Sequence, residues 1–288
     1  PEERRSKSTR TRPAASAAPS CTAAAWDARH PSEIARRSPC DGGWRRPPRC
    51  GRSGRSAASA YARGMSIRIS ALRRYPVKSM GGEALERATL DDRGIEGDRM
   101  LAVRDVDGRF ASGKSTRRFR RYDGVFELSA ATDRTGVTVS SRGGRWRVGD
   151  PRLDAALREH LGVDATVVEE GSTPHQDGGA VSLVGTATLA WCAEAWGIDA
   201  DPRRLRVNAV VATEEPFVEE RWIGTLLDVG TSRLRVVERI PRCRTVDLDQ
   251  DGAVARGAWL SRLARERDMR LAVYADVVRP GSLSIGDE

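Results

Sequence analysis

The sequence predicts a β-rich α+β fold for the part of the chain that follows residue 64, and three observations support this prediction. From residue 67 onward, short segments of alternating apolar and polar residues are separated by turn signals, which is the pattern of strands. Only three segments carry apolar residues at helical spacing. The regular alternation of strands and helices that is typical of a parallel α/β sheet is absent.

The first half of this region is expected to consist mostly of strands. The apolar and polar alternation predicts strands at residues 67–75, 83–90, 100–104, 125–130, 136–140 and 145–148. The third of these ends in the turn Asp105-Val106-Asp107-Gly108. Thr135-Gly136 and Gly143-Gly144 supply turns between the last three.

Three helices are expected in the second half. Residues 151–161 begin with proline, repeat leucine every four positions and stop at Gly162. Residues 186–196 place Cys192 on the apolar face of a helix, so we expect this thiol to be a core residue without chemistry. Residues 258–267 follow the turn at Asp251-Gly252. Apolar strands are expected at residues 181–184, 205–212, 226–229, 234–237 and 271–278.

Residues 1–64 differ from the rest in charge and composition. They hold 14 Lys and Arg against 5 Asp and Glu, the whole net charge of +9, and contain no Leu, Val, Phe or Met. Such a segment cannot bury enough apolar surface to fold, so we expect a disordered basic leader. We expect the native protein to begin at Met65. A transit peptide and a basic arm for nucleic acid are the less favoured interpretations, and we predict no nucleic-acid partner.

Cysteine usage favours a reducing compartment. Three cysteines lie in the leader, which leaves Cys192 and Cys243 in the body of the chain. Two thiols without close spacing form neither a disulfide framework nor a zinc site, and an iron–sulfur cluster needs about four. No stretch reaches the roughly 18 apolar residues of a membrane span. We therefore expect a cytoplasmic protein with no membrane partner.

Cys243 is the most informative residue of the chain. It lies in the run Arg239-Ile240-Pro241-Arg242-Cys243-Arg244-Thr245-Val246-Asp247. Flanking positive charge favours the thiolate, the form that attacks electrophiles and binds soft metals. The local sequence also fits a cysteine at a strand end with solvated arginines around it. Both interpretations stay open at this point.

One segment matches the phosphate-binding pattern G-x-x-x-x-G-K-[ST], from Gly108 to Ser115. We expect the match to be accidental because Gly108 closes a hairpin-like turn and no apolar helix follows Ser115. The basic run at residues 114–121 is typical of a solvated face. Its functional alternatives are a docking patch for an acidic electron-carrier protein and a wall beside an anionic ligand.

Several blocks, in order, resemble the family of MOSC-domain proteins. Three resemble its N-terminal β-barrel module, namely Tyr75-Pro76-Val77-Lys78-Ser79, Asp92-Arg93-Gly94-Ile95-Glu96-Gly97-Asp98-Arg99 and Asp107-Gly108-Arg109-Phe110. Others resemble the MOSC domain itself, namely residues 205–211, 217–222, 241–243, 274–281 and 285–287. The resemblance implies an N-terminal β-barrel-like module at 65–150 and a MOSC β-barrel domain with a few packed helices at 151–288.

The resemblance further implies a protein that binds the molybdenum cofactor (molybdopterin), similar to the amidoxime-reducing component and its bacterial relatives or to cofactor sulfurases. It implies that Cys243 is the metal ligand and catalytic residue. The cofactor-binding residues it implies are Lys78, Ser79, Arg99, Thr186, Arg206, Asn208, Arg242 and Tyr274. Guanidinium and ammonium groups suit an anionic cofactor. Without the resemblance, Lys78, Arg99 and Arg206 fit surface ion pairs, Asn208 a turn, and Tyr274 a core aromatic.

The function that the resemblance implies is reduction of N-hydroxylated or N-oxide small molecules by a molybdenum-dependent oxidoreductase. A non-catalytic carrier of the cofactor or its sulfur is the alternative, and a β-rich binding module without metal is a third. Pyridoxal phosphate binding stays open at the level of the family. Some bacterial relatives carry a ferredoxin domain, whereas this sequence stops at Glu288, so we expect a separate electron donor of the ferredoxin, flavin reductase or cytochrome type. The turn after Cys243 is two residues shorter than we expect for the amidoxime-reducing relatives.

Overall fold

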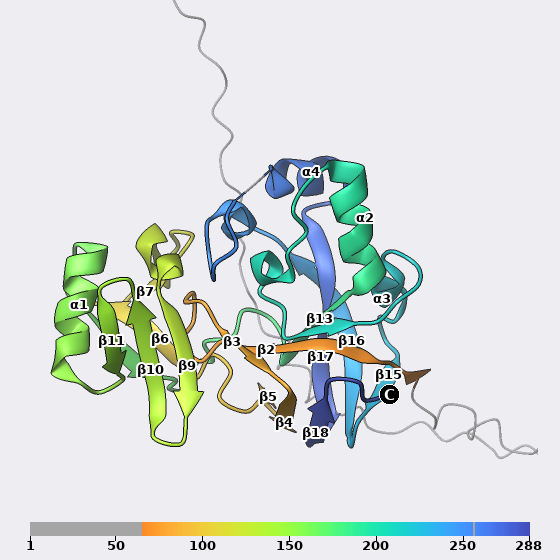
Figure 1. The fold of residues 1–288 in the computed structure, drawn as a ribbon, viewed down its shortest axis with the longest axis horizontal. Helices are drawn as coiled ribbons and strands as arrows, with labels where there is room; N and C mark the ends of the chain where they lie inside the picture. Colours follow the sequence, from red (N-terminus) through yellow and green to blue (C-terminus); the bar gives the residue numbers. More distant parts are fainter. Residues whose placement is uncertain (1–64, 256) are drawn as a thin grey trace, which may run out of the picture. The chain divides into compact units, whose positions relative to one another are not determined.

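The computed structural model describes residues 65–255 and 257–288, all of which belong to one compact unit (Figure 1). The expectations for the leader lie outside these residues. An eight-stranded sheet has the order β1-β15-β16-β17-β13-β14-β2-β3. Its strands are β1 (Met65–Ser66), β15 (Leu226–Val229), β16 (Ser232–Pro241), β17 (Arg270–Arg279), β13 (Val181–Gly185), β14 (Ala209–Val211), β2 (Ile69–Arg74) and β3 (Glu83–Leu85). A core of Ile69, Leu183, Leu227, Leu234 and Val273 packs against this sheet.

A smaller antiparallel sheet lies against the same core. It joins the last strand of the chain to an early hairpin, in the order β18-β4-β5. The strands are β18 (Gly281–Ser284), β4 (Arg87–Asp91) and β5 (Gly94–Ile95). Leu90 and Leu283 are buried in the shared core, so the C-terminal strand is held by sequence that precedes it by about 190 residues.

Two further sheets and one helix enclose a separate core. Their strands are β6 (Leu101–Asp105), β7 (Phe110–Ser112), β8 (Phe119–Arg121), β12 (Ala165–Glu169), β9 (Ser129–Asp133), β10 (Gly136–Ser141) and β11 (Gly144–Arg147). The helix α1 (Pro151–Leu161) starts at Asp150, whose carboxylate accepts a hydrogen bond from Arg152 N, and ends at the left-handed Gly162. Leu153 and Leu157 of this helix pack into the core of these sheets.

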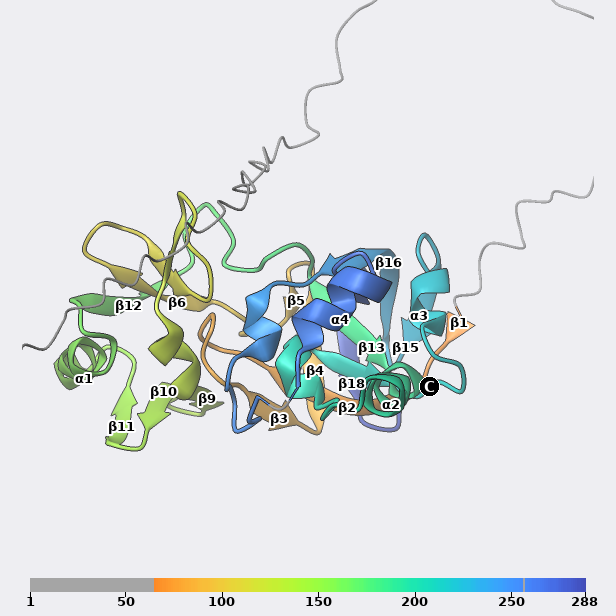
Figure 2. The ribbon, with the colours of Figure 1, turned by 90° about the horizontal axis from the view of Figure 1, so that it is seen from above.

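Helices α2 (Thr186–Trp196) and α4 (Trp259–Glu266) lie side by side on one face of the eight-stranded sheet (Figures 1 and 2). The Trp196 and Trp259 rings meet edge to face with centroids 6.0 Å apart, and Trp196 Nε1 donates to Glu266 Oε2 at 2.7 Å. Cys192 is fully buried between these helices and the sheet. The prediction that this thiol is a core residue is confirmed.

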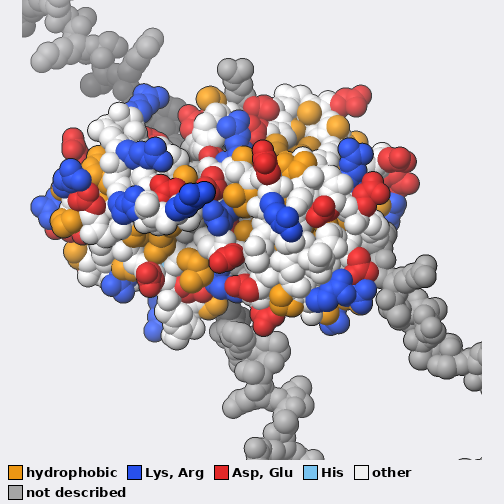
Figure 3. All heavy atoms as spheres, turned by 60° about the horizontal axis from the view of Figure 1, so that its bottom comes forward, with side chains coloured by type: hydrophobic (Ala, Val, Ile, Leu, Met, Phe, Trp, Pro, Cys, Tyr) orange, Lys and Arg blue, Asp and Glu red, His pale blue; other side chains and the backbone are white. Residues whose placement is uncertain are grey.

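The remaining helical segments are short. They are η2 (Asp123–Glu127), η3 (Pro202–Leu205), α3 (Val218–Arg221) and η4 (Arg244–Asp247). Among the described residues, no helix is both long and apolar enough to cross a membrane. Figure 3 shows acidic and basic side chains interspersed over one face, which agrees with the equal numbers of the two in residues 65–288.

The β-rich α+β class and the three predicted helices match the structure, the third within one residue at each end, and three predicted strands need correction. Residues 83–90 form two strands, which are separated at Glu86. Residues 125–130 begin in the 3-10 helix η2, because a tight turn buries both Val125 and Phe126 before β9 starts. The strand predicted at 205–212 is confined to β14, since Arg206 adopts a left-handed backbone conformation (φ 53°) that a strand does not tolerate.

Candidate functional site

The exposed thiol of Cys243 lies where the long strand β16 ends and η4 begins. The backbone of Cys243 is extended, and Sγ lies 3.2 Å from the Thr245 hydroxyl oxygen. Arg244, the next residue, pairs with Asp123 at 2.6 Å and donates to the Gly113 carbonyl at 3.2 Å. The short turn after Cys243 is therefore fixed to residues far away in the sequence, and the thiol remains accessible.

Arg242 presents a buried guanidinium beside this thiol. Nε donates to the Leu271 carbonyl at 2.8 Å, and Nη1 donates to the Leu205 carbonyl at 2.7 Å. Nη2 is buried and has no hydrogen-bond partner among the described residues. Burial lowers the pKa of Arg242 to about 10, while the nearby Tyr274 and Cys243 act in the opposite direction. Two nitrogens thus orient the group and one donor is left for a ligand.

Two more arginines stack on Tyr75. The guanidinium carbons of Arg206 and Arg99 lie 4.4 and 4.9 Å from the centroid of the Tyr75 ring. Arg99 Nη2 donates to the Arg206 carbonyl at 2.8 Å, and the Arg99 side chain also pairs with Asp98. Both arginines have left-handed backbones, with φ of 54° and 53°. Such strain in non-glycine residues is typical of functional sites. Tyr75 Oη is a further buried atom without a partner among the described residues.

Lys78 and Ser79 follow Tyr75 in the sequence and turn inward. Lys78 is 4% exposed; its Nζ donates to the His175 carbonyl at 2.7 Å and lies 2.9 Å from Asp177 Oδ1. Burial lowers the pKa of Lys78, and the negative charge of Asp177 offsets part of this effect. The Ser79 hydroxyl donates to the Ala111 carbonyl at 3.0 Å, and Ser79 also has a positive φ of 70°.

Tyr274 lies beneath a glycine pair in the loop between β12 and β13. A Cβ atom on Gly178 would come within 2.8 Å of the Tyr274 ring, and one on Gly179 within 2.7 Å. Side chains at these two positions are therefore excluded, and the loop lies directly on the ring. Burial and then Asp177 raise the pKa of the Tyr274 phenol.

The segment from Gly108 to Ser115 lacks the structure of a phosphate-binding P-loop. It runs through β7 into a bend at residues 113–118 and then into β8, without a helix after Ser115. A Cβ atom on Gly113 would lie 2.6 Å from Thr245 Oγ1, so this bend packs against the turn that follows Cys243. Lys114, in the same bend, helps to hold the pKa of Asp177 below its ordinary value. Of the basic run, Lys114 therefore lies near these site residues, whereas Arg120 pairs with Asp105 and Asp107.

Two predicted residues have other partners. Asn208 Oδ1 accepts hydrogen bonds from the backbone and hydroxyl of Ser182, and Nδ2 donates to the Arg73 carbonyl at 3.4 Å. The Thr186 hydroxyl donates to the Thr213 carbonyl at 3.2 Å. Neither side chain bonds to the residues around Cys243. Asn208 ties β2, β13 and β14 together next to Arg206, whereas Thr186 fixes the start of α2.

Sequence reasoning did not select Tyr75, Lys114 or Asp177 as site residues. Tyr75 begins the block that resembles the family, but the resemblance implies cofactor binding only for Lys78 and Ser79 of that block. Lys114 belongs to an accidental motif and to the basic run at residues 114–121, for which a solvated face is the favoured interpretation. Asp177 lies in a polar, glycine-rich loop, and its charge becomes informative only when the fold places it 2.9 Å from a buried lysine.

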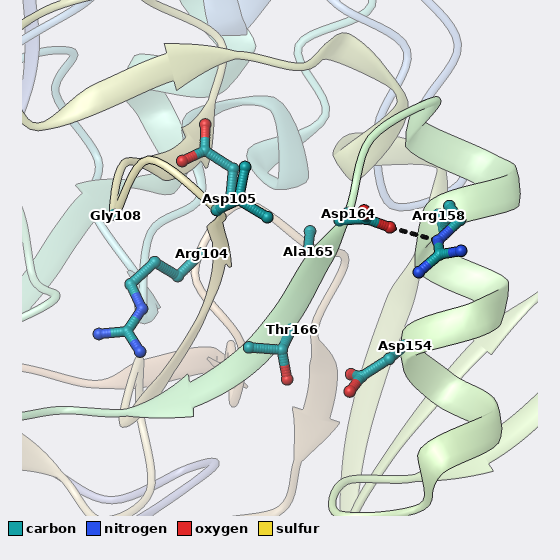
Figure 4. Close-up of a pocket in the computed structure, with 9 residues that line it drawn as sticks. Arg104, Asp105, Gly108, Asp154, Arg158, Asp164, Ala165 and Thr166 are labelled. Carbon is teal, nitrogen blue, oxygen red and sulfur yellow. Dashed lines mark ion pairs between the residues drawn. The ribbon is translucent and has the colours of Figure 1, made fainter.

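A separate depression lies between β6, β12 and α1 (Figure 4). It is lined by Arg104, Asp105, Asp154, Arg158, Asp164 and Thr166, and Arg158 pairs there with Asp164. None of the predicted site residues lines it. Among the described residues, no group of three or more His, Cys, Asp or Glu side chains is arranged to hold a metal ion.

Family models match two adjoining segments of the chain. One, described as the MOSC N-terminal beta barrel domain, matches residues 66–156, and the other, described as the MOSC domain, matches residues 160–288. The chain belongs to the MOSC-domain family. MOSC domains are associated with molybdenum cofactor sulfurases and oxidoreductase-type proteins. The boundary predicted after residue 150 stays a prediction; helix α1, which follows it, packs with the strands of the N-terminal module.

Solved structures include two with similarity to this MOSC protein. The YUAD protein from Bacillus subtilis is 14% identical, with a TM-score of 0.40 over 77% of this chain and 92% of that chain. YiiM from Geobacillus stearothermophilus is 15% identical, with a TM-score of 0.29 over 38% of this chain and 52% of that chain. No curated protein matches the chain.

The donor set of this MOSC protein fits an anionic cofactor that carries a soft metal. The buried Arg242 Nη2 and Tyr75 Oη lack partners among the described residues, so both atoms can form hydrogen bonds to a ligand. Lys78, Arg99, Arg206 and Arg242 supply cationic donors, and Cys243 supplies an accessible sulfur.

Proposed function

We propose that this protein binds the molybdenum cofactor, with Cys243 as the molybdenum ligand, and that it reduces N-hydroxylated or N-oxide small molecules. One observation carries the proposal. The exposed thiol of Cys243 adjoins Arg242, whose guanidinium is buried, oriented by two backbone carbonyls and left with one donor without a partner among the described residues. A soft ligand next to a prepared donor for an anion is what a molybdenum ion in an anionic pterin complex requires.

The remaining candidate residues have distinct proposed roles. Lys78, Arg99, Arg206 and Arg242 balance the negative charge of the cofactor, because desolvated cations hold phosphate and oxygen donors strongly. Ser79 and Tyr274 contribute hydroxyl groups at the same place. Asn208 positions Arg206 by tying the strands on either side of it, and Thr186 holds the neighbouring helix.

When bound, the molybdenum centre supplies the two-electron chemistry that removes an oxygen atom from the substrate. Removal of this oxygen atom consumes two electrons and two protons, converts the N-hydroxyl group to an N–H group and releases water. Cys243 holds the metal at an exposed position, so a small substrate reaches it without a change in the fold. We propose that the electrons come from a separate protein of the ferredoxin, flavin reductase or cytochrome type.

A second candidate function is handling of the cofactor or its sulfur. The exposure of Cys243 favours it, because an accessible thiol also carries sulfur as a persulfide. Such a protein would bind molybdenum cofactor or transfer sulfur without reducing a substrate.

Metal analysis separates these functions. The full chain is expressed with cofactor biosynthesis intact, and its molybdenum content is measured together with reduction of a hydroxylamine-type base analogue by an artificial donor. We expect nearly one molybdenum per chain and measurable turnover, both lost in Cys243→Ala. Cys192→Ala is the matched control and should keep both. Unchanged molybdenum content and rate in Cys243→Ala would refute the ligand assignment, and molybdenum without turnover would favour the carrier.

A further inference from the structure

The loop between β12 and β13 places a carboxylate among the cations of the candidate site. Asp177 Oδ1 lies 2.9 Å from Lys78 Nζ. Lys78 and Lys114 share the ring of Phe119, since their Nζ atoms lie 5.2 and 5.1 Å from its centroid. Burial alone would raise the pKa of Asp177, but Lys78, Lys114 and Arg99 hold it well below its ordinary value. Asp177 is therefore an anion at neutral pH, surrounded by positive charge.

The loop is anchored on both sides of this carboxylate. Before it, the buried His175 ring meets Phe110 edge to face with centroids 4.9 Å apart, and His175 N donates to Glu170. After it, Gly178 and Gly179 lie against Tyr274. The backbone around Asp177 is consequently fixed by contacts that do not involve the carboxylate itself.

The two partners of the ion pair differ in their access to water. The side chain of Asp177 is 51% exposed, whereas that of Lys78 is 4% exposed. The carboxylate can therefore turn into solvent by rotation about its own side-chain bonds, and the ammonium group cannot follow it. A buried ammonium without an anion is strongly unfavourable, so the site needs a counter-ion whenever no ligand supplies one.

We propose that Asp177 is a displaceable internal counter-anion, which occupies the place beside Lys78 and Lys114 that a phosphate-class anion takes when it binds. The inference rests on the proposed function in that the cofactor carries such a phosphate. A phosphate has more charge and more acceptor oxygens than a carboxylate, so it replaces a half-solvated aspartate at a lysine pair. Asp177 then keeps the empty fold stable and lowers the affinity for weak anions that compete for the site.

The consequence is measurable with inorganic phosphate alone. In Asp177→Asn the competing charge is lost while the shape of the side chain is retained. Phosphate should bind about tenfold more tightly to this variant at pH 7.5 and low ionic strength, because one like charge a few ångströms away is removed. Lys114→Ala, which alters an exposed side chain, should weaken binding about threefold or more.

The experiment is calorimetric titration of phosphate into the full chain produced without cofactor biosynthesis. Asp164→Asn is the matched control, since it removes the same charge from an exposed aspartate that pairs with Arg158 in the depression of Figure 4. Its phosphate affinity should equal that of the wild type. Thermal unfolding confirms that each variant is folded, and Asp177→Ser provides a second uncharged replacement.

Equal or weaker phosphate binding by both Asp177 variants, or no binding by any of the proteins, would overturn the inference. Weaker binding would mean that the carboxylate contacts the ligand rather than competes with it. The outcome is independent of molybdenum. If Cys243→Ala keeps its metal, the proposed ligand role fails while the phosphate result stands, and if only the phosphate result fails, the role of Cys243 is unaffected.

Discussion

The two cysteines of the described region lie in opposite environments. Cys192 is fully buried on α2, and burial raises its pKa to about 12. Around it, Trp196 and Trp259 fill space with apolar surface. Cys243 is exposed at a strand end, next to the Arg242 guanidinium, which has an unused donor and interacts electrostatically with the left-handed Arg99.

The difference lies in solvent access and in the charge that surrounds each thiol. In the region of Cys192, apolar packing favours stability, and the left-handed Phe217 and Ala272 and Trp259 Nε1, which has no partner among the described residues, belong to this apolar cluster. In the region of Cys243, the strained backbones and unpartnered donors lie among cationic side chains, and such arrangements persist when a ligand or a reaction requires them. The residue type is the same, and the surroundings decide what it does.

Thiol reactivity provides the largest expected contrast between the two regions. A pKa of about 12 leaves roughly one Cys192 thiolate in ten thousand at pH 8, and burial hinders a reagent further. Iodoacetamide should therefore alkylate Cys243 at least about a thousandfold faster than Cys192 in the folded protein. Peptide mass spectrometry over time measures both rates. Comparable rates in folded protein would mean that the two environments do not differ as described.

Stability provides the second contrast, in the opposite direction. Trp259 is fully buried beside Cys192, so Trp259→Ala should lower the free energy of unfolding by about 3–5 kcal/mol through the cavity it leaves. Cys243→Ala should change it by no more than about 0.5 kcal/mol, because the thiol is exposed. Urea denaturation of the protein without cofactor measures both. A large loss of stability in Cys243→Ala would show that the thiol has a structural role.

Segments whose ends carry local signals were the easier to predict from sequence. Helices α1 and α2 were predicted at their observed bounds, because proline and glycine mark their ends and leucine or cysteine repeats at helical spacing. The strand predicted over residues 205–212 failed at Arg206. Its left-handed backbone depends on tertiary contacts, since Arg206 Nη2 donates to the Met80 carbonyl at 2.7 Å, and no local pattern reports such a contact.

The candidate site was predictable only in part. Resemblance to the family selected Lys78, Arg99, Arg206 and Arg242, and the structure brings these side chains together. It did not select Asp177, because a charge in a glycine-rich loop gains meaning only from groups about a hundred residues away in sequence. Composition could not indicate the site either, since residues 65–288 carry equal numbers of acidic and basic side chains.

A smaller effect tests how the turn after Cys243 is held. Hydrogen bonds from Arg121 and then Arg244 lower the pKa of Asp123 to about 2. A depressed pKa stabilises the fold above the ordinary aspartate value, and this contribution is lost as the pH falls from about 4 to 2. Because Asp123 is 38% exposed, solvent screening reduces the contribution to about 1 kcal/mol. Asp123→Asn should lose that amount at pH 7 and nothing near pH 2, as urea denaturation at each pH would show. A loss of stability that is the same at every pH would mean that the charge of Asp123 does not stabilise the fold.

The smallest effect tests the region of Cys192 with the opposite sign. Burial raises the pKa of Glu219, although its carboxylate accepts hydrogen bonds from Gly185 N at 3.1 Å and the Thr188 hydroxyl at 2.9 Å. A raised pKa favours the protonated acid in the fold, so its contribution is fully present below the ordinary glutamate value and is lost as the pH rises through the folded value. Glu219→Gln, which cannot ionise, should therefore gain stability relative to the wild type as the pH rises from 4 to 8. Glu215→Gln, at an exposed position four residues earlier, is the control. A difference in free energy of unfolding between Glu219→Gln and the wild type that stays constant from pH 4 to 8 would contradict this prediction. It would mean that Glu219 does not titrate in the folded protein over this range. The region of Cys192 would then lack the base-sensitive group that contrasts with the acid-sensitive Asp123.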